Sequence, residues 1–417
     1  MCPACAASSV RAVVAPQCTM RHVTRRRGVL AAVVLIAIVT AWFVALPYVH
    51  GLSLVIRAAD MQGTARRLAD VDAHAYAERE VTIPTARGPL RARVYQPTRR
   101  SHRRAALLVS GLHPSGIDEP RLVRLARALA ASGLAIVTPD IPDLSRFEIT
   151  AAIPDAIEEA GGWLASEPEL SAGKKVGLMG ISFSGGLSIV AAARPSVANR
   201  VESVFALGGH DDLPRVLRYL CTGSEPYPSH QLGGGAGQPF VRAPHDYGVA
   251  IILLGVAERV VPRAQVEPLR AAVRRFLLAS ALDTNVDKEQ AAREFAALRQ
   301  TAKRLPEPSA TLLRYVNDRD VVHLGARLLP YVGSYGSDPS LSVSKSPRPS
   351  VPIFLLHGTD DNVIPPIESE YLAEDLRGHS RVRLLLSGLI SHAEADRPAH
   401  VGDLLQLAGF WGDLLWR

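Results

Sequence analysis

Cysteine is scarce in this 417-residue chain, which contains four. So few cysteines exclude the disulfide-rich scaffolds of small secreted proteins. Cys2 and Cys5 could form a metal-binding or redox pair, but no second pair follows at a recognisable spacing, so we favour the interpretation without a metal. Three of the four cysteines precede Met20, and the sequence from Met20 onward is a complete membrane signal by itself. Residues 1–19 are therefore a possible over-extension of the start.

Lysine and aromatic residues are also infrequent. Only five of the 47 basic residues are lysines, and aromatic residues make up 6% of the chain. The net charge is +7, and residues 1–27 hold most of it, with five arginines and no acidic residue. The rest of the chain is nearly neutral and has no basic stripe with interleaved aromatic residues. We therefore expect no nucleic-acid partner.

Charged residues are absent from Gly28 to Val49, a run of 22 residues. A helix of about 20 apolar residues spans the hydrocarbon core of a bilayer. Because Arg25–Arg27 directly precede the run, we predict a single-pass transmembrane signal anchor at 28–49. The basic segment 1–27 would lie in the cytoplasm, and the rest of the chain on the periplasmic or extracellular side of the cell membrane. A cleaved signal peptide is the alternative, although its apolar region would be shorter.

Beyond this run, short apolar segments alternate with helical patterns. We predict a helical connector at 50–79 and then a β-hairpin, because alternating residues at 81–83 and 90–94 flank a Gly-Pro turn. Further strands are predicted at Ala105–Val109, Leu134–Val137, Val176–Met179, Val204–Leu207, Ile353–Leu356 and Val382–Leu386. Several are almost continuously apolar, as strands buried on both faces of a parallel sheet are. This pattern predicts a doubly wound α/β domain.

One long segment interrupts the alternation. Residues 208–350 contain a glycine-rich loop, helical patterns near 262–281 and 287–303, and a return rich in proline and serine. We interpret this segment as a helical insertion, long enough to form a lid. The core domain would then consist of residues 80–207 and 351–417.

A serine follows the strand at 176–179 within a turn of small residues. The sequence there is Gly180-Ile-Ser182-Phe-Ser184-Gly-Gly186, and a helix follows. A serine at such a turn is held at the carboxyl edge of the sheet, and the amino end of the helix points at it. The segment resembles the nucleophile elbow of the α/β-hydrolase superfamily, Gly-x-Ser-x-Gly, except that Ser184 replaces the last glycine. Ser182 is the expected nucleophile, and the register ending at Gly186 leaves Ser184 as an alternative.

The resemblance covers roughly residues 80–207 and 351–417. It implies a mostly parallel sheet of α/β-hydrolase type with a helical lid, preceded by one transmembrane helix. Within the superfamily, the strand spacing and the segment Thr138-Pro-Asp140-Ile-Pro are most similar to dienelactone-hydrolase-like and prolyl-oligopeptidase-like catalytic domains.

A serine nucleophile requires a base, and the base requires an orienting carboxylate. In this superfamily the acid and then the histidine follow the serine along the chain. The resemblance places the acid at Asp361, directly after the strand at 353–356, with Asp360 as the alternative. It places the base at His392, in the loop after the last strand, with His400 as a more distant competitor.

The resemblance also implies an oxyanion hole. Its donors would be the backbone N–H groups of Phe183, after the nucleophile, and of Leu112, in the loop after the strand at 105–109. His113, His210 and Asp211 are candidates for lining the pocket. His210 and Asp211 could also bind a metal, but no second cluster with ligand spacing accompanies them. We therefore predict neither a metal nor an organic cofactor.

These residues together imply acyl transfer to water. Ser182 would attack a carbonyl group, His392 would accept the serine proton, and Asp361 would orient His392. The expected substrate is a small-molecule carboxylic ester, and peptidase chemistry is the alternative. The rival interpretation is a catalytically silent α/β-hydrolase fold that serves as a membrane-tethered binding or scaffold module.

Overall fold

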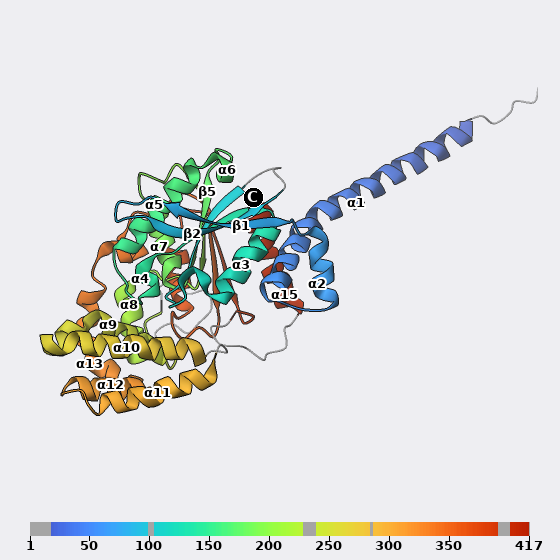
Figure 1. The fold of residues 1–417 in the computed structure, drawn as a ribbon. Coiled ribbons are helices and arrows are strands. Elements are labelled where there is room, and N and C mark those ends of the chain that lie inside the picture. The colour runs from blue at the N-terminus through green and yellow to red at the C-terminus, as the bar shows by residue number, and fades with distance from the viewer. Residues whose placement is uncertain (1–17, 99–103, 228–238, 284–286, 391–400, 417) are drawn as a thin grey trace, which may run out of the picture.

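Eight strands form one sheet at the centre of the molecule (Figure 1). The computed structural model describes residues 18–98, 104–227, 239–283, 287–390 and 401–416, with the backbone alone for residues 18–29 and 31. The strand order is β1-β2-β4-β3-β5-β6-β9-β10. The strands from β4 to β10 are mutually parallel, and β2 is antiparallel to both of its neighbours. The bounds are β1 (Tyr76–Ile83), β2 (Leu90–Pro97), β3 (Arg104–Val109), β4 (Leu134–Pro139), β5 (Val176–Ile181), β6 (Val201–Leu207), β9 (Ile353–Gly358) and β10 (Val382–Ser387).

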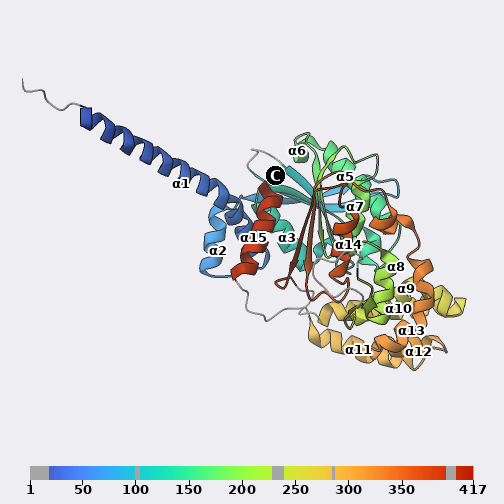
Figure 2. The same cartoon turned by 180° about the vertical axis from the view of Figure 1, so that it is seen from behind.

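Helices cover both faces of the sheet, because the strands are apolar on both sides (Figure 2). In β3, Ala106 and Leu108 belong to the core formed with α1 (Cys18–Ala58), α3 (Pro120–Ala131) and α15 (Val401–Trp416). Leu107 and Val109 belong to the opposite core, with α5 (Ala152–Ser166), α7 (Phe183–Ala192) and α14 (Ile367–Asp375). Shorter elements connect these layers: α2 (Thr64–Ala69), η1 (Asp70–Asp72), η2 (Gly116–Asp118), α4 (Pro142–Ser145) and α6 (Pro168–Ser171). The predicted doubly wound α/β fold is confirmed, and each predicted strand lies within an observed one.

The segment between β6 and β9 is mainly helical, and its helices α9–α13 gather at one end of the molecule (Figure 1). The helical patterns near 262–281 and 287–303 correspond to α10 and α11. The sequence did not indicate α9, α12 or α13, whereas an Asp-capped helix start before Leu213-Pro214, the start of α8, is expected from it and is confirmed by the N-cap at Asp212. The bounds are α8 (Leu213–Thr222), β7 (Ser224–Glu225), β8 (Phe240–Val241), α9 (Asp246–Val260), α10 (Arg263–Asp283), α11 (Lys288–Ala302), α12 (Ser309–Asn317), α13 (Val321–Tyr335), η3 (Pro339–Leu341) and η4 (Val343–Lys345).

The apolar run near the amino terminus is part of one long helix, α1, which continues through residues 50–58 without a break. Within the described residues, Ala32–Ala58 is the single helix long and apolar enough to cross a membrane. Its side chains change from exposed to buried at Gly51, where the helix packs against α15. The predicted connector at 50–79 is therefore built into the domain at its start, and β1 already begins at Tyr76.

The contact between α1 and α15 depends on glycines, which let the two backbones approach closely. A Cβ added to Gly51 would lie 1.9 Å from the carbonyl oxygen of Ala408, and one added to Gly412 would lie 2.3 Å from that of Pro47. No larger residue fits either position without moving a helix. In contrast, a Cβ at Gly402, on the same helix α15, would have no neighbour within 4 Å.

We predict that Gly412→Val lowers the stability of the chain, whereas Gly402→Val, the matched control, changes it little. Overpacking a close contact typically costs about 1–3 kcal/mol. Thermal unfolding of the detergent-solubilised full chain would show a lower midpoint for Gly412→Val alone. Equal midpoints for the two variants would contradict the packing described for α1 and α15.

Candidate active site

Ser182 occupies the sharp turn between β5 and α7. Its backbone has φ 59° and ψ −132°, a conformation that is strained for any residue with a side chain. The Ser182 N–H donates to the carbonyl oxygen of Leu207 at 2.7 Å, and the Ser182 carbonyl accepts from the Gly185 N–H at 2.8 Å. These bonds fix the turn to the end of β6 and to the first turn of α7. The result is the strand-to-helix geometry of a nucleophile elbow.

The glycines around Ser182 leave the space that this turn requires. A Cβ on Gly180 would lie 2.2 Å from the carbonyl oxygen of Ser184, and a Cβ on Gly186 would lie 2.3 Å from that of His210. A Cβ on Gly111, in the loop after β3, would lie 3.2 Å from the Cβ of Ser182. The loop after β3 therefore lies directly against Ser182.

Ser184, the alternative nucleophile, faces into the protein. Its side chain is fully buried, and its Oγ accepts from the Ile181 N–H at 2.9 Å. The hydroxyl lies within donating distance of two carbonyl oxygens, those of Ile181 (2.8 Å) and Val109 (3.1 Å). Ser184 thus ties the turn to the ends of β5 and β3. Serine can replace the last glycine of the motif because its small side chain fits this polar site.

Two backbone N–H groups have no hydrogen-bond partner in the described part of the chain: that of Phe183, the residue after Ser182, and that of Leu112, the residue after Gly111. The Leu112 carbonyl is held by Tyr247 of α9, whose hydroxyl donates to it at 2.5 Å. Burial raises the pKa of the Tyr247 phenol, so this donor keeps its proton. The insertion therefore positions the loop that carries one of the expected oxyanion donors.

The two acidic candidates after β9 point in different directions. Asp361 is buried, and its Oδ1 accepts from the N–H groups of Val363 (2.9 Å) and Ile364 (3.0 Å). A Cβ on Gly208, at the end of β6, would lie 3.4 Å from the other oxygen, Oδ2. Asp360 is exposed and pairs with Arg242 at 3.6 Å. Asp361 is therefore the carboxylate at the sheet edge where the Ser182 turn is also anchored.

A buried histidine, His357, supports the loop after β9 that carries Asp361 (the acid loop). His357 of β9 is fully buried, donates from Nε2 to the carbonyl oxygen of Ile364 (2.9 Å) and accepts at Nδ1 from the Ser369 hydroxyl (2.6 Å). Its Nε2 also lies 3.5 Å from Asp361 Oδ2. Sequence reasoning missed this role, although the spacing of His357 four residues before Asp361 was visible.

His392, the expected base, and its competitor His400 lie outside the described residues. The last described residue before them is Ile390. Its carbonyl oxygen would lie 2.3 Å from a Cβ on Gly358, the last residue of β9. The described chain therefore reaches the carboxyl edge of the sheet just before His392, after β10, the neighbour of β9.

The other predicted pocket residues differ in their surroundings. His113 is half-buried in the loop after β3, where its Nδ1 accepts from the Ser115 N–H at 3.2 Å, and burial lowers its pKa. His210 is fully buried and donates from Nε2 to the carbonyl oxygen of Leu341 at 2.9 Å; burial lowers its pKa as well. Asp211 is buried and pairs with Arg215 at 3.2 Å. Both side chains are enclosed in packing, His210 against Phe183 at the start of α7, and their place in the pocket stays a prediction.

Arg215 is surrounded by three buried carboxyl groups. Its Nε lies 2.6 Å from Glu368 Oε1 and 2.9 Å from Glu225 Oε1, while Nη2 reaches Asp211. Burial, together with the charge of Glu368, raises the pKa of Asp211 to about 7. The same two effects raise the pKa of Glu225 far above its ordinary value. Burial also disfavours the charge of Glu368, but Arg215 outweighs this effect and lowers the pKa of Glu368, so these opposite directions favour a proton on Glu225 over one on Glu368.

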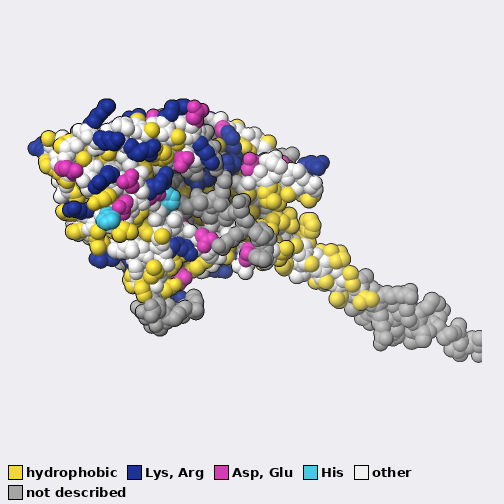
Figure 3. All heavy atoms as spheres, turned by 90° about the horizontal axis from the view of Figure 1, so that it is seen from below, with side chains coloured by type: hydrophobic (Ala, Val, Ile, Leu, Met, Phe, Trp, Pro, Cys, Tyr) yellow, Lys and Arg dark blue, Asp and Glu magenta, His cyan; other side chains and the backbone are white. Residues whose placement is uncertain are grey.

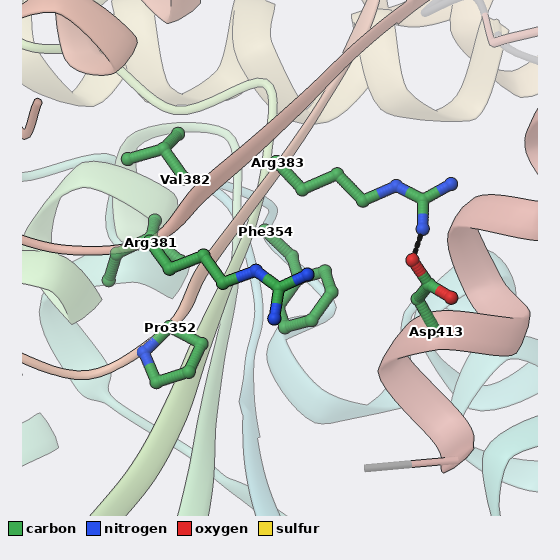
Figure 4. Close-up of a pocket in the computed structure, with 7 residues that line it drawn as sticks. Pro352, Phe354, Arg381, Val382, Arg383 and Asp413 are labelled. Carbon is green, nitrogen blue, oxygen red and sulfur yellow. Dashed lines mark ion pairs between the residues drawn. The ribbon is translucent and has the colours of Figure 1, made fainter.

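Within the described residues, no group of three or more His, Cys, Asp or Glu side chains is placed to hold a metal ion. A pocket of about 220 Å³ lies near Phe354, Arg383 and Asp413 (Figure 4). These residues stand near the starts of β9 and β10 and at the end of α15, the opposite edge of the sheet from Ser182. This pocket is not part of the candidate active site.

Several solved hydrolases resemble the chain in fold. A dienelactone hydrolase from Anabaena variabilis is 18% identical (TM-score 0.40), with 81% of this chain and 97% of that one covered. A Pyrobaculum calidifontis esterase is 15% identical (TM-score 0.43; 89% and 91% covered), and a Pyrococcus horikoshii acylaminoacyl peptidase 11% (TM-score 0.37; 78% and 38% covered). No protein-family profile and no curated protein matches the sequence. The sheet and the turn at Ser182 are those of the α/β-hydrolase fold, and the activity has to be argued from the chain's own residues.

We predict that Glu225→Gln flattens the dependence of stability on pH. A carboxyl group whose pKa is raised in the folded state takes up a proton on folding. Its contribution to the free energy of unfolding is therefore complete below the pKa of the unfolded state, about 4.3, and is lost as the pH rises toward the pKa of the folded state. Wild-type stability should fall relative to Glu225→Gln between about pH 5 and pH 9, by up to about 1.4 kcal/mol per pH unit. Denaturant unfolding at pH 5, 7 and 9 measures this difference.

Glu368→Gln is the control for this experiment. It removes the ionised partner of Arg215 and should destabilise the chain at every pH, by about 3–5 kcal/mol. If wild type and Glu225→Gln lost stability in parallel as the pH rises, the assignment of the proton to Glu225 would be wrong.

Proposed function

We propose that the chain is a membrane-anchored serine hydrolase that acts on carboxylic esters. The observation that carries this proposal is the strained turn at Ser182, with the Gly111–Leu112 loop against it and Asp361 at the end of the adjacent strand pair β6–β9. Strain of this kind persists only where surrounding structure holds it, and it concentrates at functional sites. The rival interpretation, a silent binding module, would not require a strained serine at this turn, with the N–H groups of Phe183 and Leu112 left without partners in the described part of the chain.

The reaction would proceed through an acyl-enzyme. The Ser182 Oγ attacks the ester carbonyl carbon while His392 accepts the hydroxyl proton. The oxygen of the tetrahedral intermediate accepts hydrogen bonds from the N–H groups of Leu112 and Phe183, each such donor being worth about 2.7–4 kcal/mol. The C–O bond to the leaving oxygen breaks as His392 donates its proton to that oxygen, which departs as the neutral alcohol. Water then attacks the acyl-enzyme by the same steps, which releases the acid and restores Ser182.

Asp361 is suited to orient His392. Its Oδ1 is fixed by two backbone N–H groups, so the plane of the carboxylate is set before any histidine approaches. Burial keeps water away from it, and an orienting carboxylate in this setting stabilises the imidazolium that forms when Ser182 is deprotonated. Asp360, which is exposed and paired with Arg242, has neither property.

The anchor places this activity at a membrane. The exposed apolar part of α1 is preceded by arginines, which favours the amino terminus in the cytoplasm and the catalytic domain on the periplasmic or extracellular side. An ester is the expected substrate because an alcohol is a better leaving group than an amine.

Hydrolysis of a short-chain chromogenic ester by the detergent-solubilised full chain tests the proposal. Ser182→Ala and His392→Ala should abolish turnover, and Asp361→Asn should lower kcat by about 10³–10⁴-fold. The neighbouring change Asp360→Asn is the matched control and should keep most of the activity, whereas Ser184→Ala tests the alternative nucleophile. Loss of activity in Ser184→Ala but not in Ser182→Ala would reassign the nucleophile, and no turnover by folded wild type would favour the silent module.

We predict that Tyr247→Phe lowers kcat without a comparable change in KM. The variant removes the hydrogen bond that fixes the Leu112 carbonyl, and a bond of about 1 kcal/mol corresponds to about a fivefold loss of rate. Tyr247 is a positioning residue, so the kcat effect should appear with soluble esters of different acyl length. An unchanged kcat, or a loss confined to KM, would show that the insertion does not hold this loop for catalysis.

A further inference from the structure

The end of α15 marks the amino edge of the sheet, opposite to Ser182. Arg104, the first residue of β3, donates from Nη1 to the carbonyl oxygens of Leu414 (3.2 Å) and Leu415 (2.8 Å). Arg383, near the start of β10, pairs with Asp413 (Figure 4). All the parallel strands start at the same edge of the sheet, so these contacts place the end of α15 at the amino edge. Ser182 follows the end of β5 and therefore lies at the opposite, carboxyl edge.

The buried part of α1 runs antiparallel to α15. Pro47 contacts Gly412, and Gly51 contacts Ala408, so the earlier residue of α1 meets the later residue of α15. Residues before Pro47 therefore leave the domain at the amino edge of the sheet. Figure 1 shows the same arrangement, with α1 projecting away from the helices α10–α13 of the insertion.

The junction between anchor and domain is fixed by partly buried polar contacts. The Arg57 side chain is 4% exposed; its Nη1 donates to Asp72 Oδ1 and its Nη2 to the Ser132 hydroxyl, both at 2.9 Å. His50 Nδ1 lies 2.8 Å from the other Asp72 oxygen. Together with the glycine contacts, these bonds join α1 to the domain as one body, without a flexible linker.

This arrangement separates Ser182 from the bilayer. The strand β5 has six residues, and at about 3.3 Å per residue its ends are about 20 Å apart. The apolar part of α1 begins beyond the amino edge, so a lipid ester in the same bilayer would have to leave the membrane to reach Ser182.

The surface of the insertion supports the same orientation. Among the described residues of 208–350, the exposed large apolar side chains are single ones: Val241, Leu278 and Val322. Figure 3 shows charged side chains of both signs on the face at the insertion end and apolar ones along α1. A surface that docks on a bilayer needs a contiguous apolar face, and the insertion does not present one in its described part.

We propose that α1 holds the catalytic edge facing away from the membrane, so that the substrates are water-borne acyl compounds and not lipids of the same bilayer. This inference rests on the proposed hydrolase function and on α1 as its anchor. It deepens that function by naming the substrate class. The anchor would serve to retain the enzyme in its compartment, not to bring it to a lipid substrate.

Full-length protein in lipid vesicles tests the substrate class. The probe is one fluorogenic butyrate ester, offered free in solution or joined by a short linker to the headgroup of a phospholipid in the same bilayer. The free ester should be cleaved as fast as in detergent. The short-linked ester should be cleaved at least roughly a hundredfold more slowly, because even a small misplacement of the reacting groups lowers the rate by that factor. A long polymer linker should restore cleavage. Equal rates for the free and short-linked esters would overturn the inference.

Ser182→Ala separates this outcome from failure of the proposed function. If wild type does not cleave the free ester, or if Ser182→Ala cleaves it equally well, the hydrolase proposal falls and the substrate class falls with it. If the free ester is cleaved only by wild type, the comparison of linkers decides the orientation alone.

A distance measurement tests the orientation without activity. A donor dye is placed at Ser115→Cys, in the exposed loop after β3, or at Val71→Cys, exposed beside the anchor contact of Asp72, with Cys2, Cys5 and Cys18 changed to Ser. The fourth cysteine, Cys221, is buried. Energy transfer to an acceptor lipid should be weaker from position 115, which lies at the carboxyl edge of the sheet, opposite to the edge that holds the anchor contact. Equal or stronger transfer from position 115 would contradict the orientation.

Discussion

The site depends on one constrained turn, in which the chain passes from β5 to α7 through Ser182 at positive φ. The turn forms only because Gly180 and Gly186 have no side chains and because Ser184 satisfies the backbone groups at the ends of β5 and β3. The strain has a chemical consequence, since it holds a serine hydroxyl at the carboxyl edge with the first N–H groups of α7 beside it. The loop after β3, the loop after β9 and the insertion lie around this point.

The insertion is tied to the carboxyl edge of the sheet by polar contacts. Arg242 donates to the carbonyl oxygen of Thr359 at 2.7 Å, and the His245 N–H donates to that of Asn362 at 2.9 Å, so the start of the insertion holds the acid loop from outside. Tyr247 holds the loop after β3 through the carbonyl oxygen of Leu112. Glu368, seven residues after Asp361, reaches Arg215 of α8 from the other side. Changes in the insertion would therefore act on the catalytic geometry as well as on access to it.

Much of the fold could be predicted from the sequence, because buried parallel strands appear as short apolar runs separated by helical patterns. The strand-end positions of Ser182 and Asp361 followed from the same pattern. The role of Ser184 could not, because it depends on the Val109 carbonyl, 75 residues away in sequence. The burial of His210 and Asp211 likewise depends on distant partners such as Leu341 and Glu368. Helix α9 was missed because it is apolar on most of its surface and shows no clear helical period.

The most direct test of the account is covalent labelling of the full chain with a fluorophosphonate, followed by peptide mapping of the adduct. An activated serine reacts with such a probe, whereas a hydroxyl bonded inward does not, because its lone pairs and its proton are already engaged. We expect the adduct on Ser182 and none on Ser184, with labelling abolished by Ser182→Ala and by His392→Ala. An adduct on Ser184, or none on folded protein with either a large or a small probe, would contradict the account.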